Sequence, residues 1–178
     1  QGLSEDQQLD AWNRYVPYHL LSRLHAYELM MAPYAIAHMK VSLKLAETQY
    51  RFASDKRARI FLTNALEPWQ KQLKLPEFDA LAHEAAAVNE IKRQWRFTVV
   101  IGNPQYSEKS KNEGTWIQGL MERYKETIRA EEAQIKAVSN DYVKFLCFMH
   151  HTAEAAGGAC LGVITSNGYL DGRLFRDL

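Results

Sequence analysis

The sequence contains no apolar run longer than a few residues, whereas a helix that crosses a membrane needs about 20. It also has only two cysteines among 178 residues. Cys147 and Cys160 stand in apolar surroundings, KFLCFMH and GACLGV, which predicts buried free thiols of a reducing compartment and neither a disulfide nor a zinc site. The polar, acidic segment QGLSEDQQLD is not typical of a signal peptide. We therefore expect a cytoplasmic protein with no membrane partner.

The sequence also has no large excess of positive or negative charge. Lys and Arg number 22, and Asp and Glu number 21, so the net charge is +1. This balance excludes binding of nucleic acid through bulk charge, although it is compatible with a local basic patch. The adjacent His150 and His151 have no spaced cysteine or carboxylate partners, so we predict surface histidines of a helix and no metal site.

The sequence does contain an alternation of helical and strand-like segments, which predicts an α/β fold with a mostly parallel sheet flanked by helices. Strands are expected at the short apolar runs of residues 25–29, 59–63, 97–101 and 161–165. Helical patterns are found at residues 4–22, 33–46, 78–94, 116–132 and 141–156. In the first of these, Ser4 is the expected N-cap with a capping-box partner at Gln7, and Pro17 must kink or divide the segment. The second begins near Pro33 and carries an apolar stripe: Ala32, Ile36, Met39, Leu43 and Ala46.

The strand runs show little alternation of apolar and polar residues. This favours four strands in one sheet that is buried on both faces. The pattern also begins and ends abruptly, because nothing before residue 24 looks like a strand with a glycine-rich turn and the sequence stops on FRDL. We therefore expect an incomplete fold, from a piece of a longer polypeptide.

The most informative segment is VVIGNPQYS, residues 99–107, in which a strand runs directly into Asn-Pro-Gln-Tyr. Ligands of open α/β sheets bind at the carboxyl ends of the strands. There, Asn103 and the Pro104 carbonyl could accept hydrogen bonds from an amino group, and Tyr106 could stack on a flat ring. The same residues are also compatible with a plain turn, since Asn-Pro commonly follows a strand.

Several longer segments resemble one enzyme family, in the same order. VVIGNPQYS is similar to motif IV, usually Asn-Pro-Pro-Tyr, of the amino-methyltransferases that use S-adenosylmethionine. HAYELMMAPYAIAHMKVSLKL and RIFLTNALE resemble motifs II and III of the gamma-type N6-adenine DNA methyltransferases. NDYVKFLCFMHH and GVITSNGYLDGRLFR resemble the region after motif IV in the single-chain restriction–modification enzymes of type ISP and their large fused relatives.

This resemblance covers about residues 12–178 and implies a Rossmann-like methyltransferase fold. Residues 1–178 would be a partial catalytic domain with motifs II to IV and the following region, and without motif I and the C-terminal part. In the family, the loop of motif I cradles the methionine end of the cofactor. The fragment alone is therefore expected to bind S-adenosylmethionine weakly or not at all and to be inactive.

The resemblance also assigns roles to individual residues. Glu28 matches the acidic residue that accepts hydrogen bonds from the ribose hydroxyls of the cofactor, and Asn64 matches the motif III position that contacts its adenine. The family more often has Asp at the second position. Asn103, Pro104 and Tyr106 match the catalytic motif, which would act on the N6 amino group of a flipped adenine.

One position departs from the catalytic motif, because Gln105 stands where the family has Pro. This change keeps the hydrogen-bonding and stacking residues but loosens the backbone that aims them. The polar stretch Ser107–Gly114 is expected to be a mobile loop and a candidate substrate lid. Gln105, Lys109 and Lys111 are candidate contacts to double-stranded DNA.

The resemblance further implies a parent with nuclease, translocase and target-recognition parts, where ATP and Mg²⁺ would serve other domains. The remainder of the polypeptide would then be a partner of this chain. Two alternatives stay open: a methyltransferase that acts on RNA or on protein glutamine, and a catalytically decayed scaffold that binds DNA.

Overall fold

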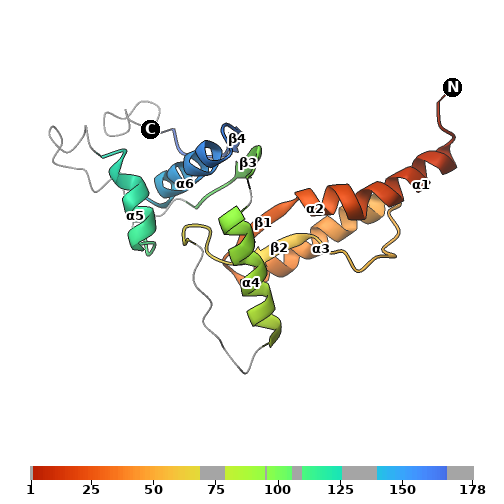
Figure 1. Ribbon diagram of the computed structural model, residues 1–178, viewed down its shortest axis with the longest axis horizontal. Helices are drawn as coiled ribbons and strands as arrows, with labels where there is room; N and C mark the ends of the chain where they lie inside the picture. Colours follow the sequence, from red (N-terminus) through yellow and green to blue (C-terminus); the bar gives the residue numbers. More distant parts are fainter. Residues whose placement is uncertain (1, 69–78, 95, 106–109, 126–139, 168–178) are drawn as a thin grey trace. The chain divides into compact units, whose positions relative to one another are not determined.

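A computed structural model describes residues 2–68, 79–94, 96–105, 110–125 and 140–167 (Figure 1). The chain divides into two compact units, Gln1–Ala65 and Leu66–Leu178. In the part of the chain that the structure describes, no helix combines the length and the apolar character needed to cross a membrane.

The first unit opens with a helical segment that proline interrupts. Helix α1 spans Glu5–Tyr15 and begins at the predicted capping box, where the Gln7 amide donates to the Ser4 hydroxyl (3.3 Å) and the Ser4 amide donates to the Gln7 side chain (3.0 Å). A π-helical turn, Val16–Leu20, contains Pro17 and leads into the short helix α2, Leu21–Arg23. Because proline cannot donate a backbone hydrogen bond, the widened turn lies where the sequence predicted a break.

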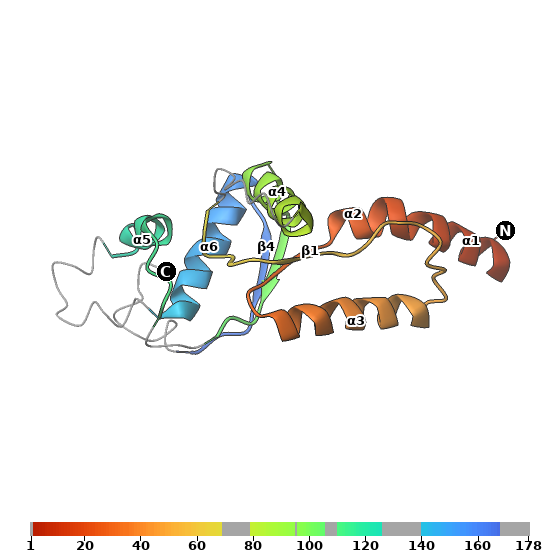
Figure 2. The same cartoon turned by 90° about the horizontal axis from the view of Figure 1, so that it is seen from below.

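A parallel pair of strands, joined by a long helix, follows in this unit. Strand β1, His25–Glu28, pairs with β2, Arg59–Leu62, and helix α3, Met31–Glu47, connects them (Figure 1). Figure 2 shows α3 running alongside α1 and α2. The core between these helices consists of buried apolar side chains: Val16, Leu21, Leu45 and Tyr50.

The apolar stripe predicted for α3 is not the face that this core buries. Ile36, Met39 and Leu43 are 47%, 55% and 56% exposed, whereas Leu45 is buried. The helix itself is confirmed, with Pro33 in its first turn. Helical periodicity identified the element, but it did not identify which face of the helix packs.

The second unit holds a second parallel pair. Strand β3, Val99–Gly102, pairs with β4, Cys160–Val163, so that Val99 lies opposite Cys160 and Gly102 opposite Val163. The described helices of this unit are α4, Asp79–Gln94; α5, Thr115–Glu122; and α6, Asp141–Ala155. Helix α6 packs beside the β3–β4 pair (Figure 2). The part of the helix predicted beyond residue 125 lies outside the described residues.

Three expectations need correction. Among the described residues, the four strands pair as two two-stranded sheets, one in each unit, where the sequence predicted one sheet; both pairings are parallel as predicted. Val99 and Ile101 are 61% and 79% exposed, so β3 is not buried on both faces in this chain. Cys147 is buried as expected, but Cys160 is exposed, because β4 presents its first residues to solvent.

A matched pair of leucines tests the core of the first unit. Leu21 is 3% exposed and Leu43 is 56% exposed. We expect Leu21→Ala to lower the free energy of unfolding by about 2–5 kcal/mol, because it removes packed methyl groups and leaves a cavity. Leu43→Ala should change it by no more than about 0.5 kcal/mol. Urea unfolding followed by circular dichroism measures both, and equal costs would show that the core is wrongly assigned.

Candidate functional site

Glu28 ends strand β1 and is held by the turn that follows it. Its Oε1 accepts hydrogen bonds from the backbone amides of Leu29 (2.9 Å) and Met30 (3.0 Å), just before α3 begins. In the described part of the chain, no hydrogen bond engages Oε2. The half-buried carboxylate is thus fixed through one oxygen, while the other keeps its capacity to accept hydrogen bonds.

Asn64 lies at the same edge of the β1–β2 pair. Glu28 is the register partner of Leu62, and the Thr63 amide extends the ladder by donating to the Glu28 carbonyl (2.7 Å). Asn64 is the next residue. Parallel pairing therefore brings the two predicted cofactor-binding residues to one carboxyl edge.

Asn103 and Pro104 lie at the carboxyl edge of the other pair. Asn103 directly follows Gly102, the last residue of β3, whose carbonyl accepts from the Ile164 amide (3.0 Å). Asn103 is exposed and Pro104 is buried. An accessible carboxamide is thus followed by an anchored proline. Tyr106 and Lys109 lie outside the described residues.

Gln105 makes a contact that the sequence did not predict. Its Nε2 donates to Oδ2 of Asp141 (3.1 Å), although the two residues are 36 positions apart. Asp141 is the first residue of α6 and is only 1% exposed. Its other oxygen, Oδ1, accepts from the Ser110 hydroxyl and from the Asn112 side-chain amide (3.0 Å).

A buried lysine completes this group, which we call the Asp141 cluster: Gln105, Ser110, Asn112, Asp141 and Lys144. Lys144 is 1% exposed, and its Nζ donates to the Ser110 hydroxyl (2.6 Å) and to the Asn112 carbonyl (2.5 Å). Burial lowers the pKa of Lys144, and the nearby negative charge of Asp141 acts in the opposite direction. The Ser110 hydroxyl therefore bridges a buried cation and a buried anion.

The Asp141 cluster involves the segment after the motif. Ser110 and Asn112 are bonded to buried side chains of α6, so hydrogen bonds tie the described part of Ser107–Gly114 to this helix. Lys111 between them is exposed. The sequence signal that could have revealed the cluster is DYVKF, where Asp and Lys recur three positions apart in an otherwise apolar helix.

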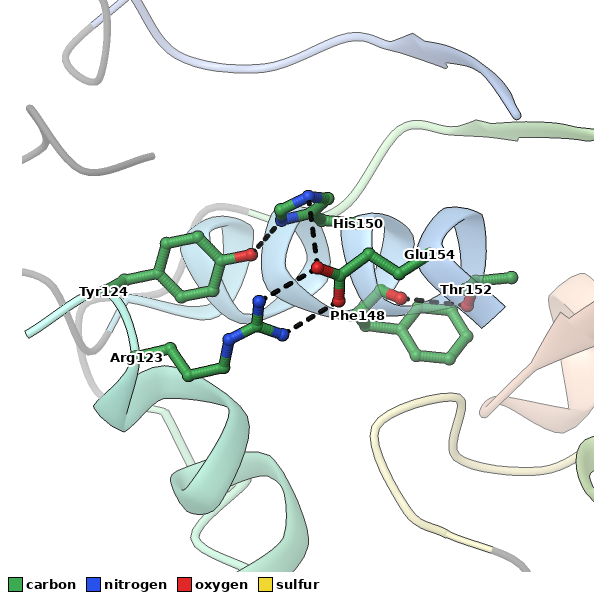
Figure 3. A network of polar contacts seen from close by, with 6 residues as sticks. All are labelled: Arg123, Tyr124, Phe148, His150, Thr152 and Glu154. Atoms are coloured by element: carbon green, nitrogen blue, oxygen red, sulfur yellow. Dashed lines mark hydrogen bonds and ion pairs between the residues drawn. The ribbon is translucent and has the colours of Figure 1, made fainter. Parts of the chain in front are cut away.

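A second polar network joins the residues after α5 to the C-terminal half of α6 (Figure 3). The Arg123 guanidinium donates to both oxygens of Glu154 (2.8 and 2.9 Å) and lowers the pKa of Glu154 to about 2. Tyr124 bonds to Nδ1 of His150, and burial raises the pKa of Tyr124 to about 12. His150 Nε2 lies 3.9 Å from Oε1 of Glu154. This network fastens α5 to α6.

The two adjacent histidines belong to this junction. His150 is exposed and takes part in the network above, and the His151 ring packs edge-on against Trp116 of α5, with centroids 5.7 Å apart. Among the described residues, no three His, Cys, Asp or Glu side chains are grouped as metal ligands. Both histidines therefore have structural partners.

The chain matches the model of one protein family, and solved structures resemble it in fold. The model of a family described as Eco57I restriction-modification methylase matches residues 25–178. The ATP-dependent type ISP restriction-modification enzyme LlaBIII, solved bound to DNA, is similar over 95% of this chain, with a TM-score of 0.66 and 18% identity. A nuclease-deletion mutant of the type ISP restriction-modification enzyme LlaGI, in complex with a DNA substrate mimic, gives 0.69 and 15%, again over 95% of this chain.

The present chain spans only a small part of these two proteins, 12% of the first and 15% of the second. At these identities the likeness concerns the fold, which is that of the methyltransferase domains of type ISP enzymes. No curated protein matches the sequence.

The two cysteines offer a direct check on burial in the second unit. Burial raises the pKa of Cys147 to about 12, so only about one thiol in 10⁴ is a thiolate at pH 8. Cys160 is exposed. We expect iodoacetamide at pH 8 to alkylate Cys160 in the native chain and to reach Cys147 only after denaturant is added. Mass spectrometry reads both sites, with Cys160→Ser as the control. Rapid labelling of native Cys147 would contradict the packing of α6.

Proposed function

Because the chain belongs to the Eco57I restriction-modification methylase family, we propose that it forms part of the catalytic domain of an adenine-specific DNA methyltransferase. The proposed reaction transfers a methyl group from S-adenosylmethionine to the N6 amino group of an adenine. Its partners are double-stranded DNA and the remainder of its own polypeptide, a cytoplasmic restriction–modification enzyme of type ISP. ATP and Mg²⁺ serve other domains of that parent.

The observation that carries this proposal is the exposed Asn103 carboxamide at the carboxyl end of β3, next to the buried Pro104. The exocyclic nitrogen of adenine is a poor nucleophile, because its lone pair is delocalised into the ring. Asn103 Oδ1 and the Pro104 carbonyl are two acceptors for its hydrogens. They favour a pyramidal nitrogen and hold it in line for attack, so the chemistry needs no strong base.

The residues at the β1–β2 edge fit a cofactor with vicinal hydroxyls. Oε1 of Glu28 is committed to two backbone amides, and Oε2 can accept from the hydroxyls of a ribose. Asn64, at the same edge, carries an amide that both donates and accepts and suits an adenine ring. When bound, S-adenosylmethionine supplies the electrophilic methyl group.

The target base must leave the duplex, at a cost of a few kcal/mol. Stacking on Tyr106 offsets about 1–3 kcal/mol of this cost in our proposal. Lys109 and the exposed Lys111 are proposed to contact phosphates beside the flipped base.

We predict that Asn103→Ala in the full-length parent lowers single-turnover methylation by at least about 100-fold, because the lost acceptor acts on the reacting nitrogen. DNA affinity should stay nearly unchanged. The assay uses cofactor with a radiolabelled methyl group and saturating duplex DNA. Gln94→Ala, which removes an exposed amide at the end of α4, is the matched control and should keep the parental rate.

Tyr106 variants in the same assay separate stacking from hydroxyl chemistry. Tyr106→Phe should be nearly neutral, while Tyr106→Ala should weaken capture of the flipped base by about tenfold or more. If Asn103→Ala methylates at the parental rate, the motif is only a turn after a strand and the proposed function fails.

A further inference from the structure

We propose that Asp141 is a positioning residue for the reaction, because its carboxylate clamps both ends of the segment that follows the Asn103–Pro104 turn. The inference rests on the proposed function and deepens it. Oδ2 holds Gln105, two residues after Asn103, and Oδ1 holds Ser110 and Asn112. One buried group thus ties two points of the chain to the first turn of α6.

The anchor itself is fixed. Asp141 is 1% exposed, and donors engage both of its oxygens. The Ser110 hydroxyl that donates to Asp141 also accepts from Lys144, one turn further along the same helix. A buried carboxylate with these partners has little freedom to turn, because each bond broken would leave a buried polar group unsatisfied.

The position of the negative charge also suits the helix. Asp141 stands at the N-terminal end of the 15-residue α6, where Asn140 caps the Tyr142 amide (3.2 Å). A carboxylate in the first turn of a helix is stabilised by the helix dipole. The clamp is therefore attached to a rigid element and not to another loop.

Gln105 connects the anchored carboxylate of Asp141 to the Asn103–Pro104 turn. Pro104 has a restricted φ angle, but Gln105 lacks a ring that would restrict it in the same way, so its position depends on the contacts that it makes. The hydrogen bond from Gln105 Nε2 to Asp141 supplies that restraint. It fixes the backbone that presents the Pro104 carbonyl and the Asn103 carboxamide, where an error of about 1 Å can cost about 100-fold in rate.

Two substitutions of Gln105 in the full-length parent test the clamp, and both change an exposed residue. Gln105→Ala removes the side chain, and Gln105→Glu keeps its size but replaces the donor by a carboxylate facing Asp141. We expect single-turnover methylation at saturating DNA to fall about tenfold for Gln105→Ala and at least as far for Gln105→Glu. The dissociation constants for DNA and for S-adenosylmethionine should change less than about twofold. Gln94→Ala is again the matched control.

A double-mutant cycle with Asp141→Asn identifies the partner. If Gln105 acts through Asp141, Gln105→Ala should cause little further loss of rate in the Asp141→Asn protein. A direct DNA contact by Gln105 would instead raise the dissociation constant for DNA and add its full effect in both backgrounds, which would overturn the inference. Should Asp141→Asn fail to fold, the two Gln105 variants still decide.

The outcomes also separate this inference from the proposed function. Parental rates for both Gln105 variants, together with a large loss for Asn103→Ala, would overturn the clamp and leave the methyltransferase proposal standing. Parental rates for Asn103→Ala as well would overturn both.

Discussion

Parallel pairing of strands is the constraint from which the candidate site follows, because it brings the carboxyl ends of neighbouring strands to one edge. In the first unit this edge holds Glu28 and the residues that follow Leu62, and in the second it holds Asn103 beside Ile164. The residues responsible are far apart in the sequence. We propose cofactor binding at one edge and catalysis at the other. Both depend on the pairing register, and a shift of either strand pair by one residue would move the site residues out of place.

The second constraint is electrostatic. Asp141 and Lys144 are each 1% exposed, and a buried charge without partners costs several kcal/mol. Hydrogen bonds from or to Ser110 and Asn112 satisfy both groups. Such a cluster adds little net stability, since replacing it by apolar side chains of similar volume often leaves the free energy of unfolding unchanged or higher. The cluster does fix the direction of the hydrogen bond to Gln105, and this bond connects α6 with the Asn103–Pro104 turn.

The elements of this fold could be predicted from the sequence, because their signals are local: the Ser4 capping box, the break at Pro17 and the apolar run before Asn103. The likeness of Glu28 and Asn103 to family positions is also a local signal. The faces that pack could not be predicted, since burial depends on neighbours distant in sequence, and the predicted stripe of α3 is exposed. For the same reason the bond between Gln105 and Asp141, 36 residues apart, has no signature in the motif itself.

We propose that this chain contributes catalytic residues to an enzyme that methylates the amino group of adenine in DNA. The most direct measurement incubates the full-length parent with duplex DNA and methyl-labelled S-adenosylmethionine, digests the DNA to nucleosides and identifies the labelled product by mass spectrometry. Label in N6-methyladenine is the predicted result. Label in a cytosine product, or label that enters RNA or protein glutamine and not DNA, would contradict the proposed adenine methylation.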